Sequence, residues 1–116
     1  NDLPPDELNG APVAGLDYGY PYCYGSDSTR DRTFAPSTAV NCSERTGALV
    51  DLPPHAAALG LLIVPDTDDF PAWARRGIMY AEHGSWNMVD DYNGYRVAFL
   101  GADEAGVRLA AGRSFL

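Results

Sequence analysis

Few side chains in this 116-residue sequence suit acid–base chemistry near neutral pH, and the two histidines lead them. His55 follows Pro54 and precedes an apolar run, while His83 lies in the run Glu82–Ser85, at the expected end of a strand and just before Trp86. Histidine changes charge most readily around neutral pH, so both are candidates for ligand contact. The alternatives are a half-buried His55 hydrogen-bonded to a neighbouring loop, and a packed turn at His83 with Trp86 buried for its apolar area.

Other catalytic chemistries find little support. Ser26, Ser28 and Ser85 lack the strand–turn–helix setting of a hydrolase nucleophile. The acidic runs 66–69 and 90–94 resemble calcium-binding loops only loosely, because neither has the terminal glutamate at the required spacing. No glycine-rich phosphate loop precedes an expected helix. Hydrolase and nucleotide-binding functions are therefore not expected.

The two cysteines, Cys23 and Cys42, lie in polar sequence without the spacing of metal ligands. One interpretation is a disulfide that closes the loop between them and stabilises the fold by about 3 kcal/mol. The other is two unrelated reduced thiols. We favour the disulfide, because so polar a loop has little apolar surface to hold it in place. Asn41 begins an Asn-Cys-Ser glycosylation pattern. Both features favour an oxidising compartment, so we expect a secreted, periplasmic or lumenal protein.

The charge balance excludes some partners. The sequence has 16 acidic and 8 basic residues, all the latter arginine, for a net charge of -8. An acidic protein repels phosphate backbones and anionic membranes, so we expect no nucleic-acid partner and no binding to a membrane surface. The longest apolar stretch, 56–64, is about half as long as a membrane span requires. We therefore expect no membrane span.

The elements that must position these residues are short. The 12 glycines and 9 prolines indicate many turns, and no long helical pattern is present. We expect loops over 1–15 and 25–43, an extended segment at 16–22, one helical turn at 70–76, a hairpin turn at Asn93–Gly94, and strands at 49–52, 58–64, 77–83, 95–100 and 107–110. The continuous apolar run at 58–64 is typical of a strand buried on both faces. The pattern predicts an all-β fold: a sandwich, a barrel or blades of a propeller.

Several motifs, in the same order along nearly the whole chain, resemble one family. The most specific is the run Ala81–Asn87, with sequence AEHGSWN. The shorter matches are PPDELN at 4–9, YGYPYC at 18–23, LPPHAAALGL at 52–61, Phe-Pro at 70–71 with Arg-Gly at 76–77, and GYRV at 94–97. Together they resemble the sugar dehydrogenases that depend on pyrroloquinoline quinone (PQQ), in the sorbosone or pyranose dehydrogenase branch.

This resemblance implies a six-bladed β-propeller similar to that of the soluble glucose dehydrogenases. At 116 residues the chain would supply two to three blades, and a propeller needs at least four to close. An incomplete propeller leaves unpaired strand edges and an open apolar face. Residues 1–116 are thus expected to form a partial propeller domain, a fragment of a longer chain. The remaining blades of the same chain or a completing protein partner would close the ring.

The resemblance also implies chemistry. Family members bind PQQ with the help of calcium, and a sugar hydroxyl or aldehyde is oxidised by hydride transfer to the quinone. His55, His83 and Trp86 are the expected contacts on the cofactor face. Calcium favours hard oxygen ligands, so backbone carbonyls near Asp2 and Leu3 are the expected metal ligands. No motif places the catalytic base in this sequence.

Two departures from the family pattern weaken the enzymatic hypothesis. Met88 stands where family members usually have an arginine that could pair with the cofactor's carboxylates, and Tyr24 stands where histidine is common. The alternative is a non-catalytic propeller that binds carbohydrate or protein, or forms a structural part of an extracellular assembly. A small independent β-sandwich is the third possibility.

Overall fold

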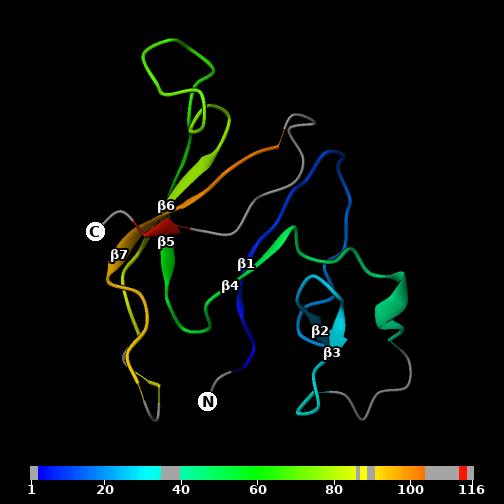
Figure 1. Cartoon of the computed structure of the whole chain (residues 1–116). Helices are drawn as coiled ribbons and strands as arrows, with labels where there is room; N and C mark the ends of the chain where they lie inside the picture. Colours follow the sequence, from blue (N-terminus) through cyan, green and yellow to red (C-terminus); the bar gives the residue numbers. More distant parts are fainter. Residues whose placement is uncertain (1–2, 35–39, 86, 89–90, 104–112, 115–116) are drawn as a thin grey trace. The chain divides into compact units, whose positions relative to one another are not determined.

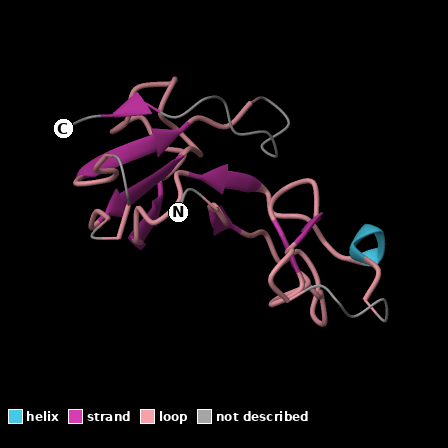
Figure 2. Cartoon of the chain, turned by 90° about the horizontal axis from the view of Figure 1, so that it is seen from below, coloured by secondary structure: helices cyan, strands magenta, loops and turns pink. Residues whose placement is uncertain are grey.

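The computed structural model describes residues 3–34, 40–85, 87–88, 91–103 and 113–114. Within these ranges the regular structure consists of short strands and one 3-10 helix, as Figure 1 and Figure 2 show. Every strand pairing is antiparallel, which confirms the predicted all-β class. The chain divides into two compact units, Asn1–Pro54 and His55–Leu116, and each is described by itself.

The first unit contains a small sheet in which β1 (Asp6–Leu8) pairs with β4 (Val50–Leu52). β4 confirms an expected strand, whereas the expectation of a loop over 1–15 is wrong at β1. Acidic residues are poor strand formers, but here the backbone has a partner in β4 and the Glu7 side chain has one too. Glu7 Oε1 accepts a hydrogen bond from Gly25 N at 2.6 Å, which ties β1 to the next segment.

The second sheet of this unit is a hairpin of β2 (Cys23–Tyr24) and β3 (Thr29–Arg30), followed later by the 3-10 helix η1 (Cys42–Glu44). We expected an extended segment at 16–22, but the first strand of this region, β2, begins only at Cys23. The amides of Tyr22 and Cys23 both donate to the Gly19 carbonyl, at 2.8 and 2.9 Å, so the chain turns there.

The second unit is built on one four-stranded sheet whose strands follow one another in chain order. β5 (Ala58–Ile63), β6 (Ile78–Glu82), β7 (Arg96–Leu100) and β8 (Arg113–Ser114) form an antiparallel meander. β5, β6 and β7 confirm three expected strands to within a residue or two at each end. The expected strand at 107–110 lies outside the described residues.

The connection between β5 and β6 covers part of one face of this sheet, at Met79 of β6 and Phe99 of β7. Val64, Ala74 and Phe99 form a small buried cluster, with Phe70 and Met79 packed against it. The connection consists of i→i+3 turns in place of the expected helical turn: Ala74 N donates to Pro71 O at 2.8 Å, and Gly77 N donates to Ala74 O at 3.1 Å. A Cβ atom at Gly77 would lie 2.4 Å from the Phe99 ring, so only glycine fits there.

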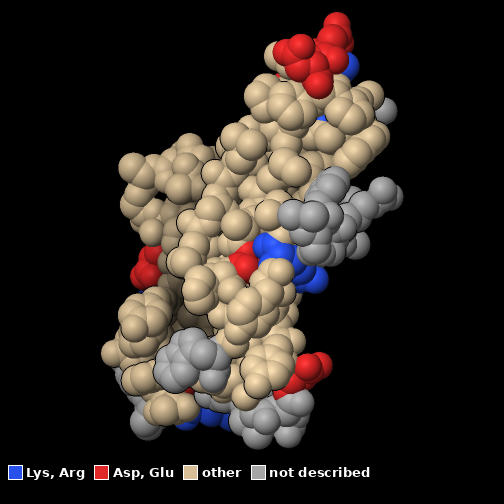
Figure 3. All heavy atoms as spheres, turned by 90° about the vertical axis from the view of Figure 1, so that its left-hand side faces the viewer, with Lys and Arg blue, Asp and Glu red and all other residues tan. Residues whose placement is uncertain are grey.

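The strand β5 differs most from expectation. Leu59, Leu61, Leu62 and Ile63 are between 52% and 78% exposed, so the prediction of a strand buried on both faces is wrong for this chain. β5 is the edge strand of the meander, and Leu61 and Leu62 point to opposite faces. Both faces of β5 are therefore largely exposed. In Figure 3, acidic side chains gather at the end of the second unit formed by the β5–β6 connection.

Candidate functional site

The segments that carry the two candidate histidines lie side by side at one end of the β5–β6–β7 sheet. His83 N donates to Ala57 O at 3.0 Å and Gly84 N donates to Ala56 O at 2.8 Å, which extends the β5–β6 pairing beyond the strands. A third segment joins them, because Ser85 N donates to Asn93 O at 2.8 Å. We call the segments 55–57, 83–85 and 93–95 the histidine loops.

Close backbone contact explains two glycines in the histidine loops. Gly84 has φ +110° and Gly94 has φ +88°, conformations that favour glycine. A Cβ atom at Gly84 would lie 2.4 Å from the Tyr95 ring, and one at Gly94 would lie 2.6 Å from the Gly84 Cα. Tyr95 crosses this contact, and its hydroxyl donates to Ser85 O at 2.7 Å. Gly94 therefore packs against Gly84, just beyond the end of β6, and the prediction of a hairpin turn at Asn93–Gly94 is wrong.

Three non-glycine residues in the histidine loops have left-handed backbone. They are His55 at φ 57°, Ala57 at φ 51° and Tyr95 at φ 57°. Such residues cost about 1–3 kcal/mol each, persist only where the surrounding structure holds them, and cluster at functional sites. The hydrogen bonds from His83 and Gly84 to this backbone supply that restraint. The histidine loops are thus the best candidate site in the second unit.

An ion pair between Glu82 of β6 and Arg96 of β7 lies next to the histidine loops. Arg96 Nε donates to Glu82 Oε2 at 2.8 Å and Arg96 Nη2 donates to Glu82 Oε1 at 3.3 Å, and the Glu82 side chain is fully buried. Hydrogen bonding to Glu82 raises the pKa of Arg96. Burial, and then the charge of Glu82, raise the pKa of Tyr80. Sequence reasoning missed this network, although a glutamate two residues after a tyrosine in a strand places both on one face.

The two histidine side chains have different surroundings. His55 Nε2 is buried and has no hydrogen-bond partner among the described residues. His83 is exposed, and its Nδ1 lies 3.4 Å from Gly84 O. Trp86, the third expected contact, lies outside the described residues. The buried ring nitrogen of His55 can donate to, or accept from, a polar ligand. The structure thus brings the backbone segments of the two histidines together, and their role as cofactor contacts stays a prediction.

The expected calcium ligands belong to the first unit. Asp2 lies outside the described residues, and Leu3 is exposed at the start of the described part. No group of three or more His, Cys, Asp or Glu side chains within the described ranges has the arrangement of a metal site. A site built from backbone carbonyls at residues 2 and 3 stays a prediction.

The disulfide between Cys23 and Cys42 is confirmed, with the Cα atoms 5.7 Å apart. It joins β2 to η1, and such a bond is typical of an oxidising compartment. Asn41 is exposed and caps η1: its Oδ1 accepts from Ser43 N at 3.2 Å, and its Nδ2 donates to Glu44 Oε1 at 2.9 Å. Glycosylation at Asn41 stays a prediction.

Comparison with known proteins finds one distant similarity. No protein-family model matches the sequence. No solved structure matches it either. The chain is 28% identical over 103 residues to a protein of Borreliella burgdorferi described as uncharacterized. The match covers 89% of this chain and 26% of that protein, so the chain spans about a quarter of the relative's length. In the described part of the chain, no helix has the length and apolar character of a transmembrane segment.

Proposed function

We propose that this chain is part of a β-propeller of the PQQ-dependent sugar dehydrogenase type, which oxidises a sugar hydroxyl or aldehyde. The observation that carries the proposal is the sheet β5–β6–β7–β8. Four antiparallel strands in consecutive order are the architecture of one propeller blade. The run Ala81–Asn87, the most specific match to that family, begins in β6 of this sheet and continues into the histidine loops.

Two further observations support a larger propeller. The apolar side chains of β5 are exposed on both faces, as they would be in a blade without its neighbours. The matched relative is about four times as long as the matched region, which leaves room for further blades in a longer chain. The remaining blades of the same chain, or a completing protein partner, would cover β5. The disulfide supports a secreted, periplasmic or lumenal location.

Within this proposal, the cofactor contacts the histidine loops at His55. A buried imidazole nitrogen without a partner among the described residues is suited to hydrogen bond to a quinone or carboxylate oxygen. When bound, PQQ supplies a quinone that accepts hydride from the sugar carbon. His55 would hold the cofactor, and the exposed His83 would contact cofactor or sugar. The pairing of Arg96 with Glu82 and the hydrogen bonds of Gly84 and Ser85 keep these loops in place.

Reconstitution tests this proposal directly. The full-length protein that contains this chain and the remaining blades, supplied with PQQ and Ca²⁺, is expected to bind the cofactor and to reduce an artificial electron acceptor when given aldoses. His55→Asn should weaken cofactor binding by about tenfold, as expected for one lost hydrogen bond to a charged group. Tyr92→Phe, at an exposed position, is the matched control. Absence of both cofactor binding and turnover over a broad panel of sugars would contradict the proposal.

A non-catalytic propeller is the second candidate, and Met88 favours it. A thioether cannot pair with a cofactor carboxylate, and Arg96 is already engaged by Glu82. Such a propeller would bind carbohydrate or protein, or serve as a structural part of an extracellular assembly. Glycan-array or pull-down binding without redox activity would identify it. Restoring the basic residue by Met88→Arg should improve PQQ binding only if the cofactor site is real.

A further inference from the structure

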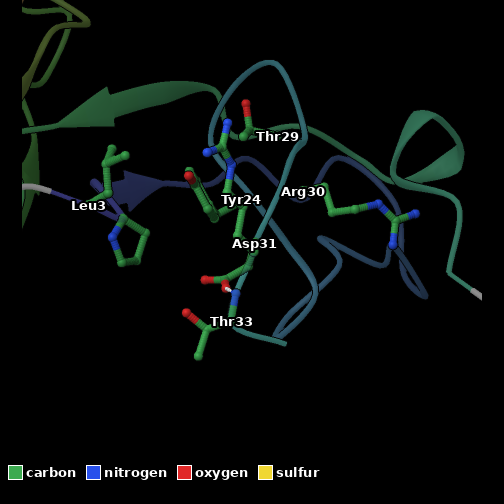
Figure 4. A pocket seen from close by; sticks show the side chains of 8 residues that line it. Leu3, Tyr24, Thr29, Arg30, Asp31 and Thr33 are labelled. Atoms are coloured by element: carbon green, nitrogen blue, oxygen red, sulfur yellow. Dashed lines mark hydrogen bonds between the residues drawn. The ribbon is translucent and has the colours of Figure 1, made fainter. Parts of the chain in front are cut away.

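A pocket in the first unit has a lining suited to a small charged ligand. It has a volume of about 480 Å³, within the range of roughly 300–1,000 Å³ typical of small-molecule sites. Its lining consists of Leu3, Pro4, Tyr24, Thr29, Arg30, Asp31, Arg32 and Thr33. In Figure 4, Leu3 faces Tyr24, Asp31 and Thr33 across an open space, while the Arg30 side chain extends away from it.

The β2–β3 hairpin fixes the positions of these side chains. Tyr24 stands opposite Thr29 in the register, and Asp31 N donates to Tyr22 O at 2.8 Å just beyond the strands. Asp31 Oδ1 accepts from Thr33 N at 2.6 Å and from Phe34 N at 3.2 Å, which holds the following turn. Because the Asp31 carboxylate organises this turn through one oxygen, its second oxygen remains able to accept a hydrogen bond from a ligand.

Two arginines line the pocket, Arg30 and Arg32, and Arg32 is the one suited to meet a charged ligand. Arg45, Arg75, Arg76 and Arg96 each pair with a carboxylate. Within the part of the chain that the structure describes, the exposed Arg32 forms no hydrogen bond and no ion pair. In a protein of net charge -8, an arginine without a carboxylate partner at a pocket wall is notable, because intramolecular acidic partners are abundant. Its guanidinium is free to form a bidentate pair with a ligand carboxylate.

The remaining walls add apolar and hydroxyl-binding groups. The Tyr24 ring, Leu3 and Pro4 offer apolar surface for the C–H groups of a ligand. Thr29 Oγ1 donates to Asp27 Oδ1 at 2.7 Å, which leaves its oxygen available as an acceptor. Asp31 adds a second acceptor for ligand hydroxyl groups. A cation, two hydroxyl acceptors and an aromatic face therefore surround one space.

We propose that this pocket binds a sugar acid, a monosaccharide-sized molecule with one carboxylate and several hydroxyl groups, such as a uronic acid. Arg32 pairs with the carboxylate, Asp31 and Thr29 accept from hydroxyl groups, and Tyr24 packs against the ring. A neutral sugar leaves Arg32 without its partner, and a phosphate dianion brings extra negative charge close to Asp31. The assignment does not depend on the proposed redox activity.

Calorimetric titration of the full chain, without added quinone or metal, tests the assignment. The ligands are D-glucuronate, D-glucose as its neutral counterpart, and inorganic phosphate. Glucuronate should bind more tightly than either of the others, and its affinity should fall as salt rises, because the contact is an ion pair. Arg32→Gln should weaken glucuronate binding by about tenfold or more, as expected for a lost charge-assisted contact. Arg76→Gln, an exposed arginine of the second unit, is the control and should bind as the parent does.

Folding is checked by circular dichroism, and Arg32→Lys serves as a second variant that keeps the charge but loses the bidentate geometry, so it should lose less affinity than Arg32→Gln. The assignment is overturned by no detectable glucuronate binding, or by equal affinity for glucose and glucuronate. Tighter binding of phosphate than of glucuronate, or unchanged affinity in folded Arg32→Gln, would overturn it as well.

Discussion

At the scale of single residues, Glu82 organises the charges of the second unit. Its buried carboxylate accepts two hydrogen bonds from Arg96, and its charge contributes to the raised pKa of Tyr80. An isolated buried carboxylate would be strongly unfavourable, so removing the Arg96 guanidinium would leave the Glu82 carboxylate buried without its partner. The Tyr80 hydroxyl lies in the same environment and stays protonated more firmly than an exposed tyrosine.

This predicts a specific loss of stability at high pH. Above the ordinary tyrosine pKa of about 10, Tyr80 ionises in the unfolded chain while it stays protonated in the folded one. The unfolded state then binds fewer protons, so the free energy of unfolding falls as pH rises towards the folded-state pKa. Tyr80→Phe should flatten this decline, and Tyr92→Phe, at an exposed position, should not. Urea unfolding at increasing pH measures both, and identical profiles for the two variants would refute the prediction.

At the scale of the elements, the histidine loops depend on the absence of side chains at two positions. Gly84→Ala would place a methyl group against the Tyr95 ring and would also strain a left-handed backbone. We expect Gly84→Ala to lower the free energy of unfolding by about 3 kcal/mol, the sum of the conformational and overpacking costs. Gly15→Ala is a matched control, since Gly15 has φ +82° but nothing within 4 Å of an added Cβ.

Gly15→Ala should lower the free energy of unfolding by about 1 kcal/mol, and this loss measures the cost of the left-handed backbone alone. Chemical denaturation followed by circular dichroism measures both variants. Equal losses would show that the contact between Gly84 and Tyr95 does not contribute to stability.

The disulfide makes a second prediction at this scale. Replacing Cys23 and Cys42 together by serine should destabilise the first unit by about 3 kcal/mol, because the unfolded loop regains its freedom. Reductant should destabilise the parent chain and leave the double variant unchanged. Thermal unfolding with and without reductant tests this, and a parent chain indifferent to reductant would speak against a stabilising role.

Some elements follow from local pattern and others depend on pairing. β6 and β7 combine strand-forming residues with turn residues at their ends, so their limits are readable from the sequence. β1 is an acidic tripeptide that becomes a strand only through β4, and no local signal marks it. The disulfide was predictable because a polar loop lay between two cysteines. The prediction of a hairpin turn at Asn93–Gly94 is wrong, because the long-range contact with Gly84 determines the conformation there.

The features of the candidate site were likewise only partly predictable from the sequence. His55 and His83 could be selected by residue type and motif, and the expected strands placed both at strand ends. The orphaned Nε2 of His55, the Glu82–Arg96 pair and the pocket beside Tyr24 depend on which segments meet in space. Such contacts between distant residues leave little trace in a single sequence.

At the scale of the whole molecule, β5 favours self-association of the chain in solution. Its leucines are exposed on both faces, and no strand among the described residues pairs with its outer edge, which favours association with another surface. We expect the isolated chain to self-associate in a concentration-dependent manner. Leu61→Lys combined with Ile63→Lys should reduce this association, and Leu49→Lys, an exposed leucine of the first unit, should not.

Size-exclusion chromatography with light scattering distinguishes these outcomes. A parent chain that stays monomeric at all concentrations would contradict the expectation. It would also remove one support for the incomplete propeller.

Trp73 offers a way to observe the second unit directly. Its indole ring meets the Phe99 ring edge to face, with the centroids 5.4 Å apart, and about half of its surface is in contact with solvent. The chain has one other tryptophan, so Trp86→Phe leaves Trp73 as the single tryptophan, on the β5–β6 connection, and its emission can be excited selectively over that of the tyrosines. A red shift of its emission would then report release of that connection from the sheet, before or together with loss of the strands.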